Sequence, residues 1–431
     1  MSQHQPLQER KDSGVTWIGD IPAHWQVARI KAISTLRNSR QIELPTGALY
    51  IGLEDVESGS GSYRPTAGSS RKSDDSTVSI FRDRDVLYGK LRPYLKKAVV
   101  AQGEGACSTE FLVLDVESEG LVKPEWLHGW LLTHDVTQRI EAGCDGAKMP
   151  RASWEHVSSI PIPFPPPEEQ AEILESLNGK TSRIDTLIAK KTRFIELLKE
   201  KRQAVITKAV TKGLDDSVQM RDSGEEWIGA IPKHWSSVKF NFVARVTEGL
   251  VDPKDPPYRD MVLVAPNHIE SGTGRLLAQE TAAEQNAESG KYTCKQGAVI
   301  YSKIRPALAK VVIAPCDCLC SADMYPMNCS EKANPEWLFY LMLSAPFTAW
   351  AVLESDRVAM PKINRESLSG LRAFVPPLDE QRSIVDYVNA RLARIDRLIL
   401  KTERSIELLK EHRAALITAA VTGKIDVREA A

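Results

Sequence analysis

The chain contains an internal duplication that spans nearly its whole length. Residues 12–25 (DSGVTWIGDIPAHW) and 222–235 (DSGEEWIGAIPKHW) are identical at ten of fourteen positions. Further paired motifs follow in the same order at offsets of 210 to 213 residues, including YGKLRP at 88–93 and YSKIRP at 301–306. Chance does not produce that order and spacing. A unit of roughly 210 residues is longer than a solenoid repeat, so each copy must contain at least one complete domain.

The composition is that of a globular protein whose net charge is close to zero. The 431 residues are 42% hydrophobic and 26% charged, and the formal net charge is -1, so a DNA-binding surface must arise from local segregation of charge. The start of the chain lacks the apolar run of a signal peptide, and no stretch of 18 apolar residues would span a membrane. Seven cysteines without an export signal favour reduced thiols. We therefore expect a cytoplasmic protein with no membrane contact.

Each copy divides into a globular part and a helical part. Short apolar, β-branched runs separated by Gly, Pro, Ser and Asp predict strands and turns in the globular part, and the stretch that begins at Trp126 predicts a helix. The expected fold class is α/β, with two mixed α/β globules. The globules are expected at 1–164 and 214–375, and the long helices at 165–213 and 376–431, the latter with a C-terminal tail.

Both helical parts carry a heptad pattern of apolar residues over about five heptads, which is typical of a coiled coil. Acidic pairs at Glu168-Glu169 and Asp379-Glu380 follow prolines and suit the first turn of a helix. Asn178-Gly179 interrupts the first pattern, where we expect a kink. The apolar positions chosen to represent this seam are Leu174, Ile184, Ile195, Leu198, Val385, Ile395, Ile406 and Leu409.

Neither long helix is expected to be stable alone, so the two should pack on each other. A two-fold relation between the copies would make the helices antiparallel and place one globule at each end. A parallel pair would crowd both globules at one end. We favour the antiparallel coiled coil, whose helices of roughly 60 Å would hold the two globules apart.

The order of globule, PP-x-x-EQ helix, globule and PP-x-x-EQ helix resembles the specificity subunits of type I restriction-modification systems. The motif occurs at 165–170 (PPPEEQ) and 376–381 (PPLDEQ). The helix ends at 209–213 (AVTKG) and 420–424 (AVTGK), and the opening WIGDIPAHW at 17–25, also look like this family. The resemblance covers nearly the whole chain, and several motifs occur twice in the right order.

This resemblance implies a role for each part. Each globule would be a target-recognition domain that binds one half of a split sequence in double-stranded DNA. The paired helices would set the spacer between the half-sites and dock two methyltransferase (M) subunits, while motor-nuclease (R) subunits would add restriction. The chain itself would be a non-catalytic specificity subunit without cofactor or metal, and S-adenosylmethionine, ATP and magnesium would belong to the partner subunits.

A basic segment is the first candidate for DNA binding. YGKLRPYLKK at 88–97 carries four basic residues and no acidic one. If it is extended, Tyr88, Lys90 and Arg92 share a face that could hold phosphates; a solvated strand edge protected by lysines is the alternative. Because the motif recurs in both copies, it suits phosphate contacts better than base recognition. The candidates from both copies are Tyr88, Lys90, Arg92, Lys96, Tyr301, Lys303 and Arg305.

Base recognition should fall where the copies differ, since different half-sites require different side chains. The stretches 63–75 and 275–289 diverge. Arginine can make bidentate contacts with guanine, which favours a role in base recognition; a variable surface loop is the alternative. The candidates are Arg64, Arg71, Lys72 and Arg275.

Two other classes of function remain open at this point. The first is a stand-alone adenine methyltransferase, because Asp255-Pro256-Pro257-Tyr258 resembles the catalytic tetrapeptide of amino-methyltransferases. That class also needs a Gly-rich strand-turn-helix for its cofactor, which we do not find, so a proline turn is the better interpretation. The second is a scaffold whose coiled coil binds protein.

Cysteines and histidines offer weaker signals. Cys316, Cys318 and Cys320 alternate but lack a second pair of ligands, which favours buried thiols over a zinc site. His24 and His234 occur in the repeated IP-x-HW motif. We expect both to hold a loop beside tryptophan rather than to transfer protons.

Overall fold

The computed structural model describes residues 9–42, 48–65, 76–116, 120–146, 148–355 and 361–428. The chain forms two compact units, which we call unit 1 (Met1–Thr192 with Arg404–Ala431) and unit 2 (Arg193–Glu403). Each unit holds one globule and part of both long helices, and each is described by itself.

Short strands precede the helices in unit 1, and a last strand leads into the long helix α4. The strands are β1 (Arg10–Asp12), β2 (Asp20–Pro22), β3 (Gln26–Arg29), β4 (Thr35–Leu36), β5 (Arg40–Gln41), β6 (Leu49–Ile51), β7 (Val78–Phe81), β8 (Val86–Gly89), β9 (Ala98–Val100), β10 (Gly105–Ser108), β11 (Phe111–Asp115) and β12 (Pro161–Phe164). The α-helices are α1 (Pro124–Leu131), α2 (His134–Ala142), α3 (Trp154–Ser159) and α4 (Pro167–Lys212). Short 3-10 helices span Ile30–Ala32, Leu53–Asp55 and Pro93–Leu95.

Unit 2 repeats this order of elements and leads into the long helix α8. The strands are β13 (Met220–Asp222), β14 (Ala230–Pro232), β15 (Ser236–Lys239), β16 (Ala244–Val246), β17 (Leu263–Val264), β18 (Tyr292–Cys294), β19 (Val299–Ser302), β20 (Val311–Ile313), β21 (Cys318–Cys320), β22 (Met324–Cys329) and β23 (Arg372–Val375). The α-helices are α5 (Pro335–Leu343), α6 (Ala345–Ser355), α7 (Arg365–Gly370) and α8 (Leu378–Val421). The 3-10 helices span Phe240–Phe242, Tyr258–Asp260, Pro266–His268 and Pro306–Leu308.

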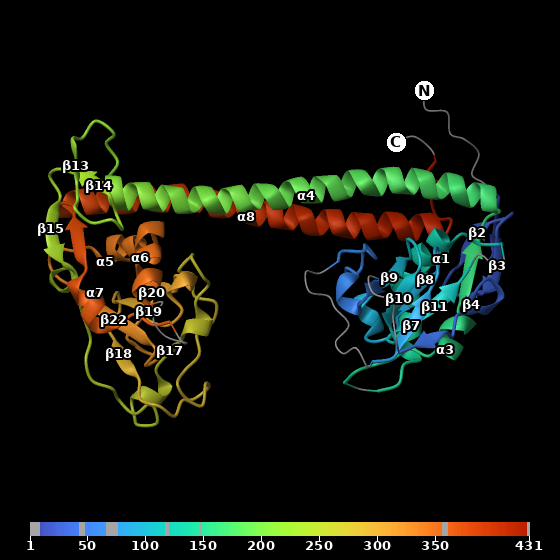
Figure 1. Ribbon diagram of the computed structural model, residues 1–431, viewed down its shortest axis with the longest axis horizontal. Helices are drawn as coiled ribbons and strands as arrows, with labels where there is room; N and C mark the ends of the chain where they lie inside the picture. The colour runs from blue at the N-terminus through green and yellow to red at the C-terminus, as the bar shows by residue number, and fades with distance from the viewer. Residues whose placement is uncertain are drawn as a thin grey trace. The chain divides into compact units, whose positions relative to one another are not determined.

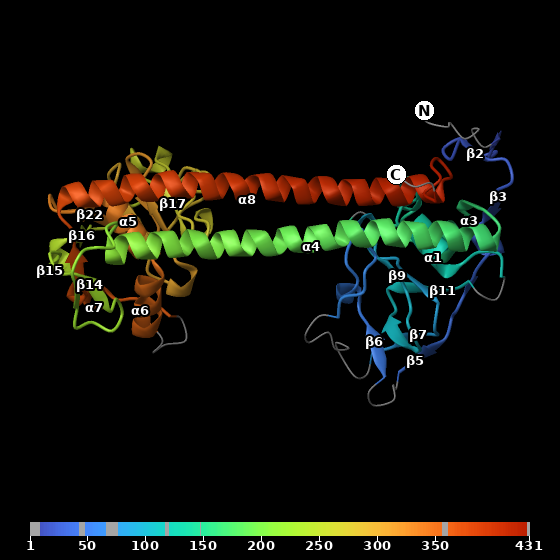
Figure 2. The ribbon, with the colours of Figure 1, turned by 90° about the horizontal axis from the view of Figure 1, so that it is seen from above.

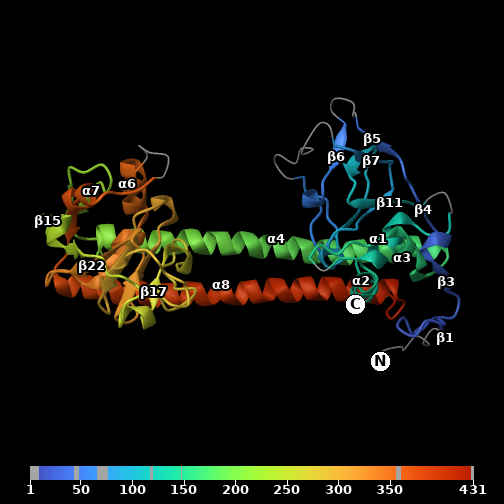
Figure 3. The same cartoon turned by 90° about the horizontal axis from the view of Figure 1, so that it is seen from below.

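The two globules share their sheet topology. In unit 1 one sheet has the order β4-β11-β8-β9 and the other β5-β7-β10-β6; unit 2 repeats the first as β16-β22-β19-β20 and three strands of the second (β6, β10 and β7) as β17-β21-β18. The pairs β10 with β6 and β21 with β17 are parallel, whereas β8 with β11 and β19 with β22 are antiparallel. Figure 3 shows β5, β6 and β7 on the side of the unit 1 globule away from α4. The predicted pair of mixed α/β globules is confirmed.

The central strand of each globule is buried on both faces. In β8, Val86 and Tyr88 pack into the core that contains α1, while Leu87 packs into a second core together with Ile51 and Phe81. A strand covered on both faces needs apolar side chains at successive positions rather than in alternation. In unit 1, α1 lies between the strands and the long helices (Figure 1).

Local sequence explains how the helices of the globules begin. Pro124 and Pro335 stand at the first turn of α1 and α5, where their fixed φ fits and no amide hydrogen bond is lost. The Asn334 side chain caps α5 by accepting a hydrogen bond from the Glu336 amide at 2.8 Å. These two helices bring their buried tryptophans, Trp126 and Trp337, into the cores.

The long helices run antiparallel within each unit. In unit 1 the first half of α4 lies beside the last part of α8 (Figures 1 and 2). There Arg413 Nε donates to Asp185 Oδ1 at 2.9 Å. In unit 2 the equivalent bond joins Arg202 to Asp396 at 3.1 Å. The predicted antiparallel pairing is confirmed, and the two arginines are equivalent in the repeat. The helix α4 continues through Asn178-Gly179, and the kink expected there stays a prediction.

The described residues also include no single helix that is long and apolar enough to cross a membrane. Only α5 and α6 taken together, bent by 65° at their junction, meet the length and composition that a span would need.

Candidate nucleic-acid interface

A turn with an unusual backbone follows β8 in unit 1 and β19 in unit 2. Arg92 has φ 52° and ψ 65°, and Arg305 has φ 50° and ψ 60°, which is the left-handed region that residues with a Cβ rarely adopt. The Arg92 amide donates to Pro150 O at 2.8 Å, and the Arg305 amide donates to Pro361 O at 2.9 Å. The Pro150 and Pro361 carbonyls therefore hold the arginine backbone of each turn in place. Strained backbone that the surroundings fix in this way is frequent at functional sites.

The cationic side chains of these turns are available to a ligand. Arg92 and Arg305 are exposed, and within the described parts of the chain neither guanidinium makes a hydrogen bond or ion pair. Lys90 is partly buried and its ammonium is likewise without a described partner. Lys303 Nζ lies 5.5 Å from the centre of the Tyr325 ring, a cation–π contact. Each turn thus presents two cations that pair with no acidic side chain among the residues that the structure describes.

The prediction that Tyr88 and Tyr301 share an exposed face with these cations is wrong. Both tyrosines are only 1% exposed, because their strands are covered on both faces. The strand β8 ends at Gly89 and the chain turns, so Tyr88, Lys90 and Arg92 do not form one extended face. Burial raises the pKa of both tyrosines. Neither side chain can touch DNA in this conformation.

The lysines that follow have different surroundings. Lys97 Nζ donates to Leu53 O at 2.6 Å, and Lys310 Nζ donates to Pro266 O at 2.5 Å, so this repeated lysine holds the loop before the ESGSG or ESGTG turn. Lys96 is partly buried, and burial lowers its pKa. Ala309 takes its place in unit 2 with the same left-handed backbone.

The candidates for base recognition lie beside the ESGSG and ESGTG turns. Arg64 Nη2 lies 3.2 Å from Glu57 Oε2, and Arg275 Nη2 lies 3.1 Å from Glu270 Oε1. The arginine side chains are 72% and 62% exposed, so these ion pairs contribute little to stability and can be exchanged for another partner. Arg71 and Lys72 lie outside the described residues.

The glycine turns themselves are packing features. Gly61 has φ +66°, and a Cβ there would lie 2.3 Å from the His128 ring; Gly274 has φ +75° and the Phe339 ring in the same place. An antiparallel bridge from Val56 to Tyr63 closes the first turn. The turns at 57–61 (ESGSG) and 270–274 (ESGTG) are therefore hairpin-like, and the second glycine of each is required by the close approach of α1 or α5.

Two repeated motifs that are far apart in sequence meet in space. His24 Nε2 lies 2.7 Å from Glu169 Oε2, 145 residues away, and His234 Nε2 lies 2.7 Å from Glu380 Oε2. The sequence suggested no carboxylate for these histidines, yet the PP-x-x-EQ motif supplies one. The pairing holds the IP-x-HW loop at the first turn of the long helix, as expected for a structural histidine.

The glutamine of the PP-x-x-EQ motif is a buried connector. Gln170 has no exposed surface; its Nε2 donates to Leu121 O and Pro165 O, and its Oε1 accepts from the Lys123 amide at 2.8 Å. Gln381 makes the same three hydrogen bonds in unit 2. The motif therefore joins each long helix rigidly to the loop before α1 or α5.

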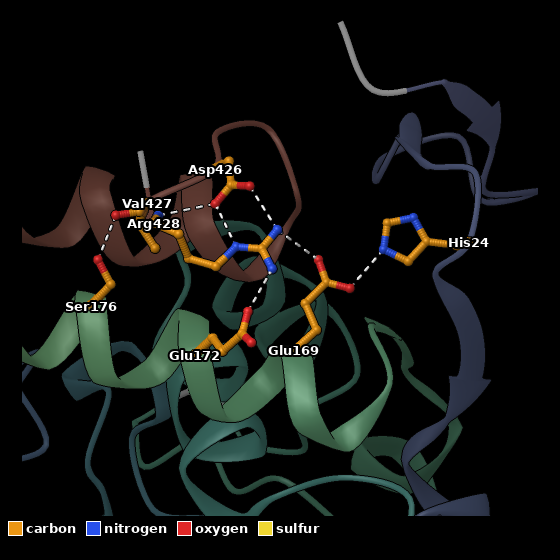
Figure 4. Close-up of polar contacts among 7 residues, drawn as sticks. All are labelled: His24, Glu169, Glu172, Ser176, Asp426, Val427 and Arg428. Atoms are coloured by element: carbon orange, nitrogen blue, oxygen red, sulfur yellow. Dashed lines mark hydrogen bonds and ion pairs between the residues drawn. The ribbon is translucent and has the colours of Figure 1, made fainter. Parts of the chain in front are cut away.

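Unit 1 has an additional polar cluster at its C-terminal tail (Figure 4). Arg428 contacts Glu169 and Glu172 of α4 at 3.2 and 3.0 Å, and Asp426 at 2.7 Å. The Ser176 hydroxyl donates to Val427 O at 2.5 Å. Unit 2 has Ser217 at the position equivalent to Arg428, so the cluster is not repeated and no repeated motif marks it.

The seam residues of the long helices are directed at each other. Exposure is at most 9% for Ile184, Ile195, Leu198, Val385 and Ile395, while the other three seam positions are partly buried: Leu174, Ile406 and Leu409. Buried seam side chains serve the pairing of α4 with α8 and leave little surface for another subunit.

A second set of leucines, which lie outside the seam of the long helices, remains exposed. Leu187 and Leu408 in unit 1 are 46% and 49% exposed, and Leu197 and Leu398 in unit 2 are 46% and 40% exposed. Leu187 and Leu398 are equivalent in the repeat, as are Leu197 and Leu408. The heptad pattern does not reveal these leucines, because it selects only the buried seam.

The other motifs have structural explanations. Asp255-Pro256-Pro257-Tyr258 forms a turn in which Asp255 O accepts from the Arg259 amide at 3.1 Å, as the proline-turn interpretation predicted. Cys318 and Cys320 have no exposed surface, and all seven cysteines are free thiols. Burial and the neighbouring Cys294 thiol raise the pKa of Cys318.

The chain is similar in sequence to known proteins. No protein-family profile matches the chain. The type I restriction enzyme EcoDI specificity subunit of Escherichia coli is 32% identical over 320 residues, 71% of each chain. The putative MjaX specificity subunit of Methanocaldococcus jannaschii is 22% identical over 438 residues, 96% of each chain.

Solved structures show the same fold at lower identity. A chain from a study of complex assembly and conformational transition of the type I R-M system superposes with a TM-score of 0.70, at 17% identity, over 94% of this chain and 99% of its own. The HsdS subunit from Thermoanaerobacter tengcongensis gives a TM-score of 0.51, at 17% identity, over 94% and 98%. The chain belongs to the family of type I restriction enzyme specificity subunits.

Proposed function

We propose that this chain confers DNA sequence specificity on a type I restriction-modification complex, with each globule binding one half of a bipartite site. The observation that carries this proposal is the matched pair of strained turns, each with an exposed arginine and a lysine that have no acidic partner within the described ranges of the chain. The same device in both units suits a task performed twice on chemically identical groups, as DNA phosphates are.

Phosphate contacts fit the chemistry of these turns. Arg92 and Lys90 in unit 1, and Arg305 and Lys303 in unit 2, can each neutralise phosphates and release counterions. The Pro150 and Pro361 carbonyls fix the backbone of these turns before DNA binds. Binding therefore costs little further conformational entropy of the backbone. Such contacts orient a protein on the duplex without selecting a sequence.

Sequence selection then falls to residues that differ between the units. Arg64 and Arg275 remain our candidates from the described residues, because both are largely exposed and both can contact guanine. Arg71 and Lys72 are proposed on sequence grounds alone. The Glu57 and Glu270 carboxylates would keep the unbound arginines oriented.

The long helices would set the spacer between half-sites and dock two M subunits, with R subunits joining the assembly. The exposed Leu187, Leu197, Leu398 and Leu408 support docking, since large apolar side chains on the outside of a helix pair mark contact surfaces. We propose that the chain acts in the cytoplasm as a non-catalytic subunit. S-adenosylmethionine, ATP and magnesium would bind to its partners.

The experiment is an anisotropy titration of the complex with M subunits on duplex DNA, over a range of salt concentrations. Phosphate contacts predict a steep linear fall of log affinity with log salt. Exchange of residues 12–163 for the globule of another specificity subunit should change one half-site only. A flat salt response, or a change in both half-sites, would refute this function.

A further inference from the structure

Unit 1 contains a groove. In unit 2, an aromatic side chain of the same polypeptide fills the equivalent space. The groove has a volume of about 520 Å³ and lies between α1 and the two long helices. Its walls include His128, Gly129, Asn178, Arg413 and Ile417. All of its lining residues belong to unit 1, so the groove is a feature of that unit alone.

The internal repeat shows what the same space accepts. Tyr340 of α5 stands at the position of Gly129, at an offset of 211 residues. Its hydroxyl donates to Asn389 Oδ1, and Asn389 Nδ2 donates to Glu336 Oε2 at 3.1 Å. The Tyr340 side chain is 7% exposed. In unit 2, therefore, a phenol fills the space and ties α5 to the long helix α8.

Unit 1 has an asparagine equivalent to the hydrogen-bond partner of Tyr340, but it has a glycine in place of the tyrosine. Asn178 corresponds to Asn389; it is exposed, and its side chain makes no hydrogen bond within the described parts of the chain. Glu125 corresponds to Glu336 but pairs with Arg84 at 3.1 Å instead. The side chain of Asn178 is thus open to a hydroxyl from elsewhere.

The apolar residues of the groove wall are more exposed in unit 1 than their counterparts are in unit 2. Ile417 is half-buried, whereas its counterpart Ile206 has no exposed surface. Leu174 is partly exposed, whereas its counterpart Val385 is 5% exposed. Unit 1 therefore leaves uncovered the apolar surface that unit 2 covers with its tyrosine.

We propose that the groove of unit 1 binds a tyrosine side chain presented by a protein that docks on α4 and α8. The ring would cover Leu174 and Ile417, and the hydroxyl would donate to Asn178 Oδ1. An aromatic anchor with one polar contact in a pocket is a frequent centre of protein interfaces. The proposal rests on the proposed function only in naming the M subunit as that protein.

The first test uses p-cresol, the side-chain analogue of tyrosine, with the purified full-length chain. We expect saturable binding with one site per chain, measured by ligand-observed NMR. Asn178→Ala should weaken it roughly threefold to tenfold, the usual effect of one lost hydrogen bond. Asn389→Ala, the matched control, should leave it unchanged because Tyr340 already occupies that space. No saturable binding, or equal affinity for both variants, would overturn the proposal.

A second variant should create the site anew. Tyr340→Gly opens the equivalent space in unit 2, and a cavity lined by apolar groups binds small aromatic molecules. We expect two p-cresol sites per chain in this variant, with circular dichroism as the check on folding. Binding that remains at one site in a folded Tyr340→Gly chain would contradict the inferred equivalence.

The partner is tested with the M subunit. Gly129→Tyr should fill the groove and weaken M-subunit binding at least tenfold; a Cβ there would lie 3.3 Å from Val421 Cγ1, so folding is checked in parallel. Asn178→Ala should weaken M binding by the same factor as p-cresol binding. Unchanged M binding in both variants would overturn the partner assignment. The salt titration above is independent of this groove, so the two proposals can fail separately.

Discussion

The buried Gln170 side chain accepts a hydrogen bond from the backbone amide of Lys123 at 2.8 Å, and Gln381 does the same for Asn334 at 2.7 Å. These bonds join the first turn of each long helix to the loop before α1 or α5. A rigid joint at this place transmits the position of the helix to the globule. The glutamine of the motif therefore determines how a helix and its globule are held together within one unit.

Gln170→Ala should destabilise unit 1 by about 3 kcal/mol, because three buried backbone groups lose their partner. Chemical denaturation with a probe in unit 1 measures the loss. Glu168→Gln, in the same turn but without these contacts, is the control and should unfold like the wild type. A loss below about 0.5 kcal/mol would mean that water replaces the amide without cost.

Arg92→Ala with Arg305→Ala should weaken DNA binding by the complex for all sequences alike and reduce the salt slope by about two. The reason is the loss of one phosphate contact in each unit. Anisotropy titrations on cognate and unrelated duplexes measure both quantities. Lys97→Met, which removes a cation that is bound to Leu53 O, serves as the comparison. A change of sequence preference would instead assign these arginines to base recognition.

Leu187→Glu with Leu408→Glu should weaken binding of the M subunit at least tenfold, since charged groups would replace the exposed apolar surface of unit 1. Analytical ultracentrifugation with purified M subunit gives the affinity. Thr186→Glu, one position away and outside this surface, is the matched control. If the double variant assembles normally, docking uses another face of the helices.

Arg428→Ala should lower the stability of unit 1 at neutral pH by about 1 kcal/mol, since the ion pairs are partly exposed. The hydrogen bond from Arg428 holds the pKa of Asp426 below its usual value. A lowered pKa in the folded state gives stability that is present above the unfolded pKa near 3.9 and is lost as pH falls through the folded pKa. Urea denaturation between pH 7 and pH 2 should show the wild type and the variant converging at the acid end. A constant difference across that range would exclude this carboxylate as the cause.

The sequence predicted the features that arise from repetition and periodicity. Two globules, two long helices and their antiparallel pairing follow from the duplication and the heptads, and the repeated Arg202 and Arg413 make equivalent contacts across the helix pair. The error over Tyr88 and Tyr301 has a physical reason. Alternation assigns faces to a strand, but it does not show that a second layer covers the outer face.

The sequence did not predict which distant segments contact each other. His24 and Glu169 lie 145 residues apart, and only their recurrence as His234 and Glu380 hinted at a shared task. Arg428 has no counterpart in the repeat, so no pattern marked it. The strained backbone of Arg92 also has no signature, because residues with a Cβ seldom adopt it.

The tail around Arg428 has a consequence for how such a chain can be cut and joined. In unit 2 the peptide runs on from Gly213 of the helix end into β13, beside Trp235. In unit 1 the helix end at Gly423 lies against Pro22 and Trp25, and its carbonyl accepts from Arg10 at 2.9 Å, so β1 contacts the end of α8 where unit 2 is continuous. A permuted gene that links these two segments and opens between Gly213 and Met220 should encode the same fold, with a peptide link in place of the salt bridges of Arg428.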